Sequence, residues 1–160
     1  MPVTFSPREK GGSDETEYDA WRQIPGSTGY RLLHESEWEY ACRAGSSTEF
    51  SNGDDESLLV DYCQMYPSKL TARCSEKLPN AWGLHDVHGN VWEWCVDLYG
   101  ESRGSDRVLR GGSWRHDAAN CRTALRNSNV PSHRSDFIGF RLALSSPSGV
   151  SGPAEQVQAK

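Results

Sequence analysis

The sequence lacks the features of membrane-spanning, exported and nucleic-acid-binding proteins. In its 160 residues no apolar run approaches the roughly 18 residues that a membrane-spanning helix needs. The N-terminus carries no apolar signal region after a basic head, which leaves a cytoplasmic location as the default expectation. Lys and Arg number 17 against 22 Asp and Glu, and a net charge of -5 provides no positive field for phosphates. We therefore expect no membrane span and no nucleic-acid partner.

Paired cysteine motifs are also missing. The five cysteines, Cys42, Cys63, Cys74, Cys95 and Cys121, are widely spaced, with no C-x-x-C pair and no Cys/His cluster at zinc spacing. An odd number leaves at least one free thiol. We favour reduced, buried cysteines that pack as small hydrophobic residues, and one disulfide stays open as the alternative.

Aromatic residues compensate for the low apolar content. Only 36% of the residues are hydrophobic, but six Trp, six Tyr and four Phe provide large surfaces for burial, and 15 Gly and 8 Pro indicate many turns. The length suits one soluble domain. Within residues 1–28, apolar residues at helical spacing predict a short helix before Pro25. Residues 35–44 predict a second helix, which Gly45 can end in the left-handed conformation.

Short strands are expected in the second half of the chain. Alternating apolar and polar residues predict a strand from Val91 to Cys95, and 107–110 and 138–144 predict two more. Residues 46–80 are mostly loop, and the composition of 145–160 predicts a flexible tail. Two helices and a small antiparallel sheet with long loops make the fold class α+β.

Five motifs occur in a fixed order along residues 29–144. They are Tyr30-Arg31-Leu32 ahead of Glu35-Ser36-Glu37-Trp38-Glu39-Tyr40-Ala41, then Pro79-Asn80-Ala81-Trp82-Gly83-Leu84-His85-Asp86, His88-Gly89-Asn90-Val91-Trp92-Glu93-Trp94, Arg110-Gly111-Gly112-Ser113-Trp114 and Gly139-Phe140-Arg141. In this order and spacing they closely resemble the formylglycine-generating enzymes, also called sulfatase-modifying factors. The resemblance implies a variant of the C-type lectin fold for residues 29–144. It also implies that the tryptophans in these motifs pack in the core and that Arg110 and Arg141 bond to carbonyls or acidic partners.

One departure from the family concerns its chemistry. The family's enzymes hold copper with two cysteines five residues apart, and the corresponding residues here are His116 and Cys121. A linear dithiolate site for a soft monovalent metal needs both sulfurs, so we expect no copper and no formylglycine-generating activity. An oxidase that uses another ligand near Cys121, and a thiolate–imidazole pair of Cys121 with His116, are the catalytic alternatives.

A calcium site of the family matches this chain position by position. The resemblance implies that two side chains and two backbone carbonyls, from Asp86, Gly89, Val91 and Glu93, hold a structural calcium ion. Several oxygens at a turn suit a hard cation. In the alternative interpretation Asp86 caps a turn and Glu93 pairs with an arginine.

The segment from Arg115 to Leu144 lacks five residue types. It contains no Lys, Glu, Gln, Met or Trp over about 30 residues, although these types make up roughly a fifth of the rest of the chain, an absence expected by chance about once in a thousand cases. Codons ending in C cannot encode any of the five, and such codons arise when the adenines of AAC are randomised. The segment therefore resembles the variable region of a protein diversified by a diversity-generating retroelement, a class that uses the same lectin-fold variant.

The resemblance separates a fixed frame from twelve candidate variable positions within residues 115–137. These positions carry cationic, anionic, amide, hydroxyl, aromatic and aliphatic side chains, which suits an exposed binding surface better than a core. They are Arg115, His116, Asp117, Leu125, Asn127, Ser128, Asn129, Val130, His133, Ser135, Asp136 and Phe137. We expect non-catalytic binding of a protein or other macromolecule, with His116 and Asp117 both exposed. An ordinary loop of a fixed interaction module is the alternative.

Overall fold

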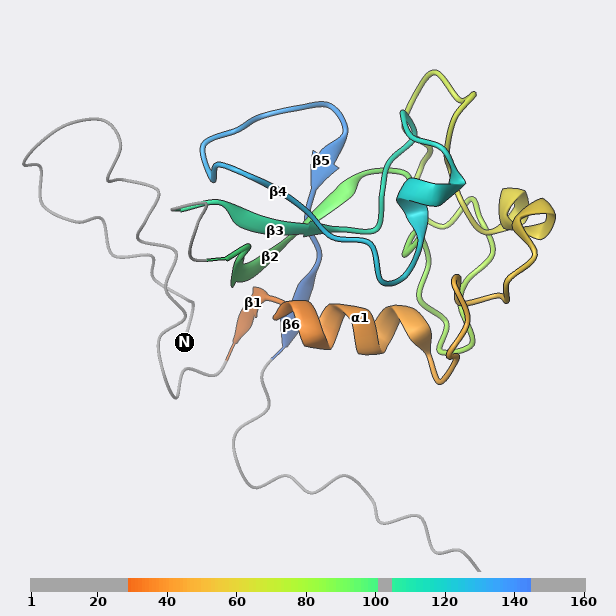
Figure 1. The fold of residues 1–160 in the computed structure, drawn as a ribbon, viewed down its shortest axis with the longest axis horizontal. Helices are drawn as coiled ribbons and strands as arrows, with labels where there is room; N and C mark the ends of the chain where they lie inside the picture. Colours follow the sequence, from red (N-terminus) through yellow and green to blue (C-terminus); the bar gives the residue numbers. More distant parts are fainter. Residues whose placement is uncertain (1–28, 101–104, 145–160) are drawn as a thin grey trace, which may run out of the picture.

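The computed structural model describes residues 29–100 and 105–144, so the helix expected within 1–28 and the tail 145–160 lie outside the described residues. The described chain contains one α-helix, short 3-10 helices and two small sheets (Figure 1). The strands gather on one side of the molecule and the long loops on the other (Figure 1). Among these residues no helix has the length and apolarity that crossing a bilayer requires.

Helix α1 spans Glu35–Arg43 and buries Trp38 and Cys42 on one face. Its end agrees with the expected left-handed stop, but Ala44 already adopts this conformation, with φ 47°, and donates its N–H to the Tyr40 carbonyl at 3.2 Å. Gly45 follows with φ 92°. Two consecutive left-handed residues turn the chain sharply away from the helix axis.

The first turn of α1 is capped by carboxylates. Glu37 accepts the N–H of His34 at 2.8 Å, and Asp97 from the following strand accepts the N–H of Glu35 at 2.6 Å. Free N–H groups at a helix start favour negative charge. The helix start is therefore held although His34 itself is a weak capping residue.

A two-stranded sheet joins the two ends of the described chain. Strand β1 (Tyr30–Leu32) pairs antiparallel with β6 (Leu142–Leu144), with Tyr30 opposite Leu144. The pairing encloses the rest of the domain between its first and last strands.

The second sheet has four strands in the order β4-β3-β2-β5. Its members are β2 (Trp92–Leu98), β3 (Arg107–Arg110), β4 (Asn127–Asn129) and β5 (Ile138–Gly139). Two pairs are antiparallel, but β2 and β5 run parallel, so the expectation of a purely antiparallel sheet was wrong. The single strand expected over 138–144 is divided between the two sheets at Phe140 and Arg141. Strand β4 was not expected, because Asn and Ser have low strand propensity.

Two 3-10 helices interrupt the loops, η1 (Glu56–Asp61) and η3 (Ala118–Cys121). Each begins at an aspartate whose side chain accepts a backbone N–H of the first turn, Asp55 from Ser57 and Asp117 from Asn120. These caps fix short segments that have few other backbone hydrogen bonds.

Three hydrophobic clusters form the core. Trp38 packs with Cys42 and Cys95 under α1, while Trp92 and Trp94 form a cluster of their own on β2. The expectation of a buried tryptophan was wrong for Trp82, which is 49% exposed and meets the ring of Tyr40 edge-on at 4.9 Å. Trp82 lies in the surface turn after Asn80, and Trp114 is half-buried.

Candidate ligand-binding face

Burial alternates along the segment that follows Trp114. None of the twelve variable positions is buried, and together they form what we call the variable face. The most exposed members are Arg115, Asp117, Asn127, Val130 and Asp136. The residues between them include fully buried ones, which are Ala118, Cys121, Thr123 and Pro131. The segment is therefore anchored by one set of side chains and displays another.

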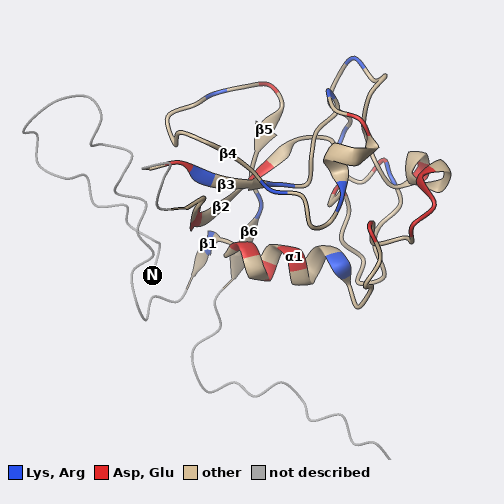
Figure 2. Ribbon diagram, viewed as in Figure 1, with Lys and Arg blue, Asp and Glu red and all other residues tan. Residues whose placement is uncertain are grey.

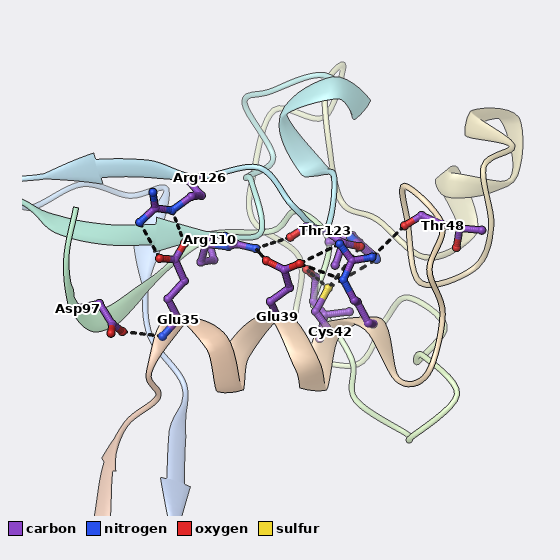
Figure 3. A network of polar contacts seen from close by, with 11 residues as sticks. Glu35, Glu39, Cys42, Thr48, Asp97, Arg110, Thr123 and Arg126 are labelled. Atoms are coloured by element: carbon purple, nitrogen blue, oxygen red, sulfur yellow. Dashed lines mark hydrogen bonds and ion pairs between the residues drawn. The ribbon is translucent and has the colours of Figure 1, made fainter. Parts of the chain in front are cut away.

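Arg110 anchors the segment to α1. Its guanidinium, 1% exposed, donates to Glu35 and Glu39 at 2.7 Å each and to the carbonyl of Thr123 (Figure 3). Acidic residues lie along α1 (Figure 2). An arginine that satisfies two carboxylates and a carbonyl orders all three partners at once, which suits a structural role for Arg110.

A second arginine anchors the chain just before β4. Arg126 donates to both oxygens of Glu35 at 2.6 and 2.7 Å (Figure 3). Its guanidinium carbon also lies 4.9 Å from the ring centroid of Tyr99. The hydrogen bonds that Arg126 donates to Glu35 raise the pKa of Arg126 and outweigh the effect of burial, which lowers it. Glu35 thus connects Arg110 and Arg126, one buried and one half-exposed.

Glu39 shares this network and also pairs with Arg43 at 2.8 Å within the helix. Burial alone would raise the pKa of the Glu39 carboxyl, but hydrogen bonds from Arg43 and Arg110 lower it below its ordinary value. The Glu39 carboxyl is therefore charged at neutral pH.

His88 also holds this segment, a role that its sequence motif did not predict. It is 1% exposed, with Nδ1 2.8 Å from the Cys121 carbonyl, while the Ser51 N–H donates to Nε2 at 3.0 Å. These partners assign the proton to Nδ1. Burial lowers the pKa of His88 to about 4, so the ring is neutral at physiological pH. Nothing in the sequence around His88 distinguishes it from an exposed turn histidine.

His116 is only half-buried, so the expectation that it is exposed was wrong, whereas Asp117 is exposed as expected. The Nδ1 atom of His116 lies 2.6 Å from the hydroxyl of Ser113, and the His116 ring meets those of Trp92 and Phe137 edge-on. Partial burial lowers its pKa. His116 supports the loop as well as contributing to its surface.

Leu125 and Phe137 also face inward in part. Both are half-buried and pack against the cluster of Trp92, Trp94 and Leu109. The variable face therefore has an inner rim of packed side chains and an outer set that contacts solvent. Substitution at the rim changes core packing, whereas substitution in the outer set does not.

Cys121 and His116 do not form the thiolate–imidazole pair considered above. Cys121 is fully buried in a cluster with Phe50 and Cys63, and His116 bonds to Ser113 instead. The thiols of Cys63 and Cys121 are in hydrogen-bond contact, which together with burial raises the pKa of Cys63. A buried thiol held in its neutral form is a poor nucleophile and metal ligand.

The cysteines agree with the expectation with one exception. All five are free thiols, and Cys42, Cys63, Cys95 and Cys121 are buried. Burial raises the pKa values of Cys42 and Cys95 to about 12. Cys74 is exposed, so for this residue the expectation of burial was wrong.

Three of the four residues expected to bind calcium, Asp86, Val91 and Glu93, line a cavity of about 340 Å³, and Gly89 is not part of its lining. Asp86 Oδ1 is buried there with no hydrogen-bond partner among the described residues, while Oδ2 accepts the Ser75 N–H at 3.0 Å. The Glu93 carboxylate accepts Trp38 Nε1 at 2.6 Å and two bonds from Arg141 at 2.6 Å each. The expected structural role of Arg141 is confirmed by these bonds.

The donor set fits a hard cation at Asp86 more closely than at Glu93. A buried carboxylate oxygen without a partner is costly unless a cation or water satisfies it. Glu93 Oε2 already accepts two hydrogen bonds, and Oε1 accepts one and keeps a free lone pair. Glu93 thus pairs with Arg141, as the alternative interpretation expected, and still keeps one lone pair on Oε1 for an ion.

Comparison with known proteins agrees with this architecture. Residues 12–146 match the model of the sulfatase-modifying factor enzyme 1-like domain. The chain is 33% identical to a formylglycine-generating enzyme of Streptomyces coelicolor, over 82% of this chain and 50% of that protein. It is 34% identical to an inactive C-alpha-formylglycine-generating enzyme 2 of Mus musculus, over 83% and 47%. The chain spans about half the length of the curated relatives it matches.

Among solved structures, Treponema denticola variable protein 1 superposes with a TM-score of 0.72 at 33% identity, covering 82% of this chain and 53% of that one. The α+β architecture is therefore the C-type-lectin variant of formylglycine-generating enzymes, as the motifs implied. Relatives of this fold include active enzymes, inactive ones and a variable protein. The chain belongs to the sulfatase-modifying factor enzyme 1-like domain family.

Proposed function

We propose that this protein binds a macromolecular ligand through the variable face, without catalysis, and that a diversity-generating retroelement diversifies the face. The alternation of buried anchors and unburied variable positions along residues 115–137 is the observation that carries the proposal. A loop anchored in this way can change its displayed side chains with little loss of stability. The likeness to a protein named as a variable protein supports it.

Binding would follow from rigidity of the backbone and diversity of the side chains. The Arg110 and Arg126 network and His88 hold the segment before a ligand arrives, so little ordering is required on association. The outer side chains then decide affinity and specificity. A net charge of -5 favours a protein over a nucleic acid as the ligand.

The decisive experiment sequences codons 115–137 and the flanking DNA in many cells of the source population. We expect substitutions confined to the twelve positions, a near-copy of the segment rich in Asn codons, and a reverse-transcriptase gene nearby. An invariant segment with no near-copy would overturn diversification and leave a fixed interaction module.

The oxidase alternative is tested by its metal. Position 116 carries a histidine bonded to Ser113, and Cys121 is buried against Cys63, so these residues do not fit a linear copper site. We expect no stoichiometric uptake when copper(I) is titrated into the reduced protein. Uptake of one equivalent that is lost in Cys121→Ser would favour the sulfatase-modifying oxidase instead.

We also propose a structural calcium ion at the cavity beside Asp86. Asp86 and Glu93 would supply side-chain oxygens, and Gly89 and Val91 backbone carbonyls, so that the ion would link the turn to the start of β2. The unpartnered Asp86 oxygen supports this proposal. Calcium, but not an equal concentration of magnesium, should raise the melting temperature, and Asp86→Asn should abolish the rise. Asp54→Asn, a change at an exposed carboxylate, serves as the control.

A further inference from the structure

Arg115 occupies a distinctive place on the variable face. Its guanidinium carbon lies 5.0 Å from the ring centroid of Trp114 and 5.3 Å from that of Phe137. The side chain is nevertheless 52% exposed. Stacking on two rings restrains a long side chain that is otherwise free to move, which lowers the entropy cost of binding through it.

The hydrogen-bond donors of this guanidinium are largely unused. Among the described residues its one polar side-chain contact is with Asp136, at 3.8 Å, which is too long for a hydrogen bond. The arginines that anchor the segment differ, because Arg110 and Arg126 each donate at 2.7 Å or less to carboxylates. Arg115 therefore presents a planar fork of donors to solvent.

We infer that Arg115 is the specificity-determining anchor of the variable face, and that its partner is a carboxylate on an acidic peptide segment of a protein ligand. This inference rests on the proposed function. A planar guanidinium binds a carboxylate through two parallel hydrogen bonds, and arginine beside an aromatic residue is typical of the residues that dominate protein interfaces. The rings of Trp114 and Phe137 give apolar contact next to the charge.

The charges around Arg115 favour a ligand with one carboxylate over an extended polyanion. Asp136 lies 3.8 Å from the Arg115 guanidinium, exposed Asp117 is two residues away in the chain, and the chain carries a net charge of -5. A single carboxylate can replace the long contact with Asp136, whereas a chain of phosphates would meet both aspartates. The ligand is therefore expected to combine one buried acidic side chain with apolar neighbours.

The test is selection of random twelve-residue peptides displayed on phage against the immobilised protein. The selected peptides should share one Asp or Glu beside an apolar residue. Arg115→Ala and Arg115→Lys should each weaken their binding by about tenfold or more, because lysine lacks the planar fork. Arg122→Ala, which removes an exposed arginine paired with Glu49, is the matched control and should change binding less than about twofold.

A double-mutant cycle completes the test. Changing the shared acid of the peptide to its amide should cost as much as Arg115→Ala, and the two changes together should cost no more than either alone. Selected peptides that bind the variable face without an acid, or that bind Arg115→Ala as well as the parent, would overturn the inference and leave the proposed function standing. Stronger competition by a phosphopeptide than by the acidic peptide would overturn the assignment to a carboxylate. Absence of any peptide whose binding responds to substitutions on the face would count against both proposals.

Discussion

The two halves of the segment after η3 are held in different ways. Residues 121–126 are fixed by contacts through side chains and buried carbonyls, with Thr123 bonded to Arg110 and Arg126 bonded to Glu35. Residues 127–137 begin with β4, which is held by backbone pairing with β3. The first half contains one variable position, Leu125, and the second contains eight.

This difference has a physical reason. Backbone hydrogen bonds between strands do not depend on the identity of most side chains, whereas an ion-pair anchor is lost when one partner changes. All three residues of β4 are variable positions. The proposed diversity thus falls where backbone hydrogen bonds hold the chain, and the residues predicted to be fixed include those whose side chains hold it.

The largest expected effect on stability comes from removing Arg110, which anchors residues 121–126 through Thr123. Arg110→Ala leaves Glu35, Glu39 and the Thr123 carbonyl without their buried partner, and should lower the free energy of unfolding by about 3–5 kcal/mol. Urea unfolding measures the change. Arg122→Ala, at an exposed ion pair, should stay within about 1 kcal/mol. A loss of similar size in both variants would show that Arg110 is not a special anchor.

The next largest effect on stability is expected at Gly112, which lies just before the segment that follows Trp114. Its φ is 80°, and an added Cβ would lie 2.6 Å from the Cys121 sulfur and 2.7 Å from the Asn120 carbonyl oxygen. Gly112→Ala should therefore cost about 3 kcal/mol from backbone strain and overpacking. Gly100→Ala meets open space and should be nearly neutral in the same thermal unfolding experiment. Equal stability of the two variants would contradict the close packing at Cys121.

Lowering the pH should loosen the His88 anchor. Because the pKa is about 4 in the folded protein and about 6.5 when unfolded, the unfolded chain binds more protons between these values. The free energy of unfolding should fall by about 2 kcal/mol from pH 6.5 to 5, and level off below pH 4 for this group. His116, whose pKa is lowered by partial burial, adds to the slope.

The His88→Gln variant isolates this contribution. Its unfolding free energy should depend on pH less steeply than that of the parent between pH 6.5 and 5, whatever its stability at pH 7. His133→Gln, on the variable face, should keep the parent's slope. Identical slopes for His88→Gln and the parent would mean that the ring is not neutral and buried.

The smallest expected effects on stability compare the inner rim of the variable face with its outer set. Phe137→Ser removes a ring that packs on the Trp92 cluster and should cost about 1–3 kcal/mol. Val130→Thr, at an exposed position, should change stability by less than about 0.5 kcal/mol. Comparable losses at both positions would remove the distinction between rim and outer set.

Local patterns predicted much of this fold. The spacing of Trp38 and Cys42 and the glycine after them predicted α1 to within one residue. Apolar alternation predicted the first part of β2, and the short strand expected over 107–110 is β3. The gap in residue types and the resemblance to diversified proteins together predicted twelve variable positions; none of them is buried, and their variation stays a prediction. These are properties of neighbouring residues, which periodicity and composition report directly.

Other features depend on residues far apart in the chain. Asp97 caps α1 from 62 residues away, Arg110 joins the helix to Thr123, and His88 bonds to the Cys121 carbonyl. The parallel pairing of β2 with β5 and the division of residues 138–144 between two sheets also needed the whole fold. So did the partial burial of His116 and the exposure of Trp82.

The sequence by itself determined the family and the single helix after β1, and it predicted twelve variable positions. Only the tertiary structure decided which side chains anchor the variable face and which ones it displays. The physical reason is that burial and ion pairing are set by groups brought together from distant parts of the chain, whereas helical and strand periodicity is set within a few residues.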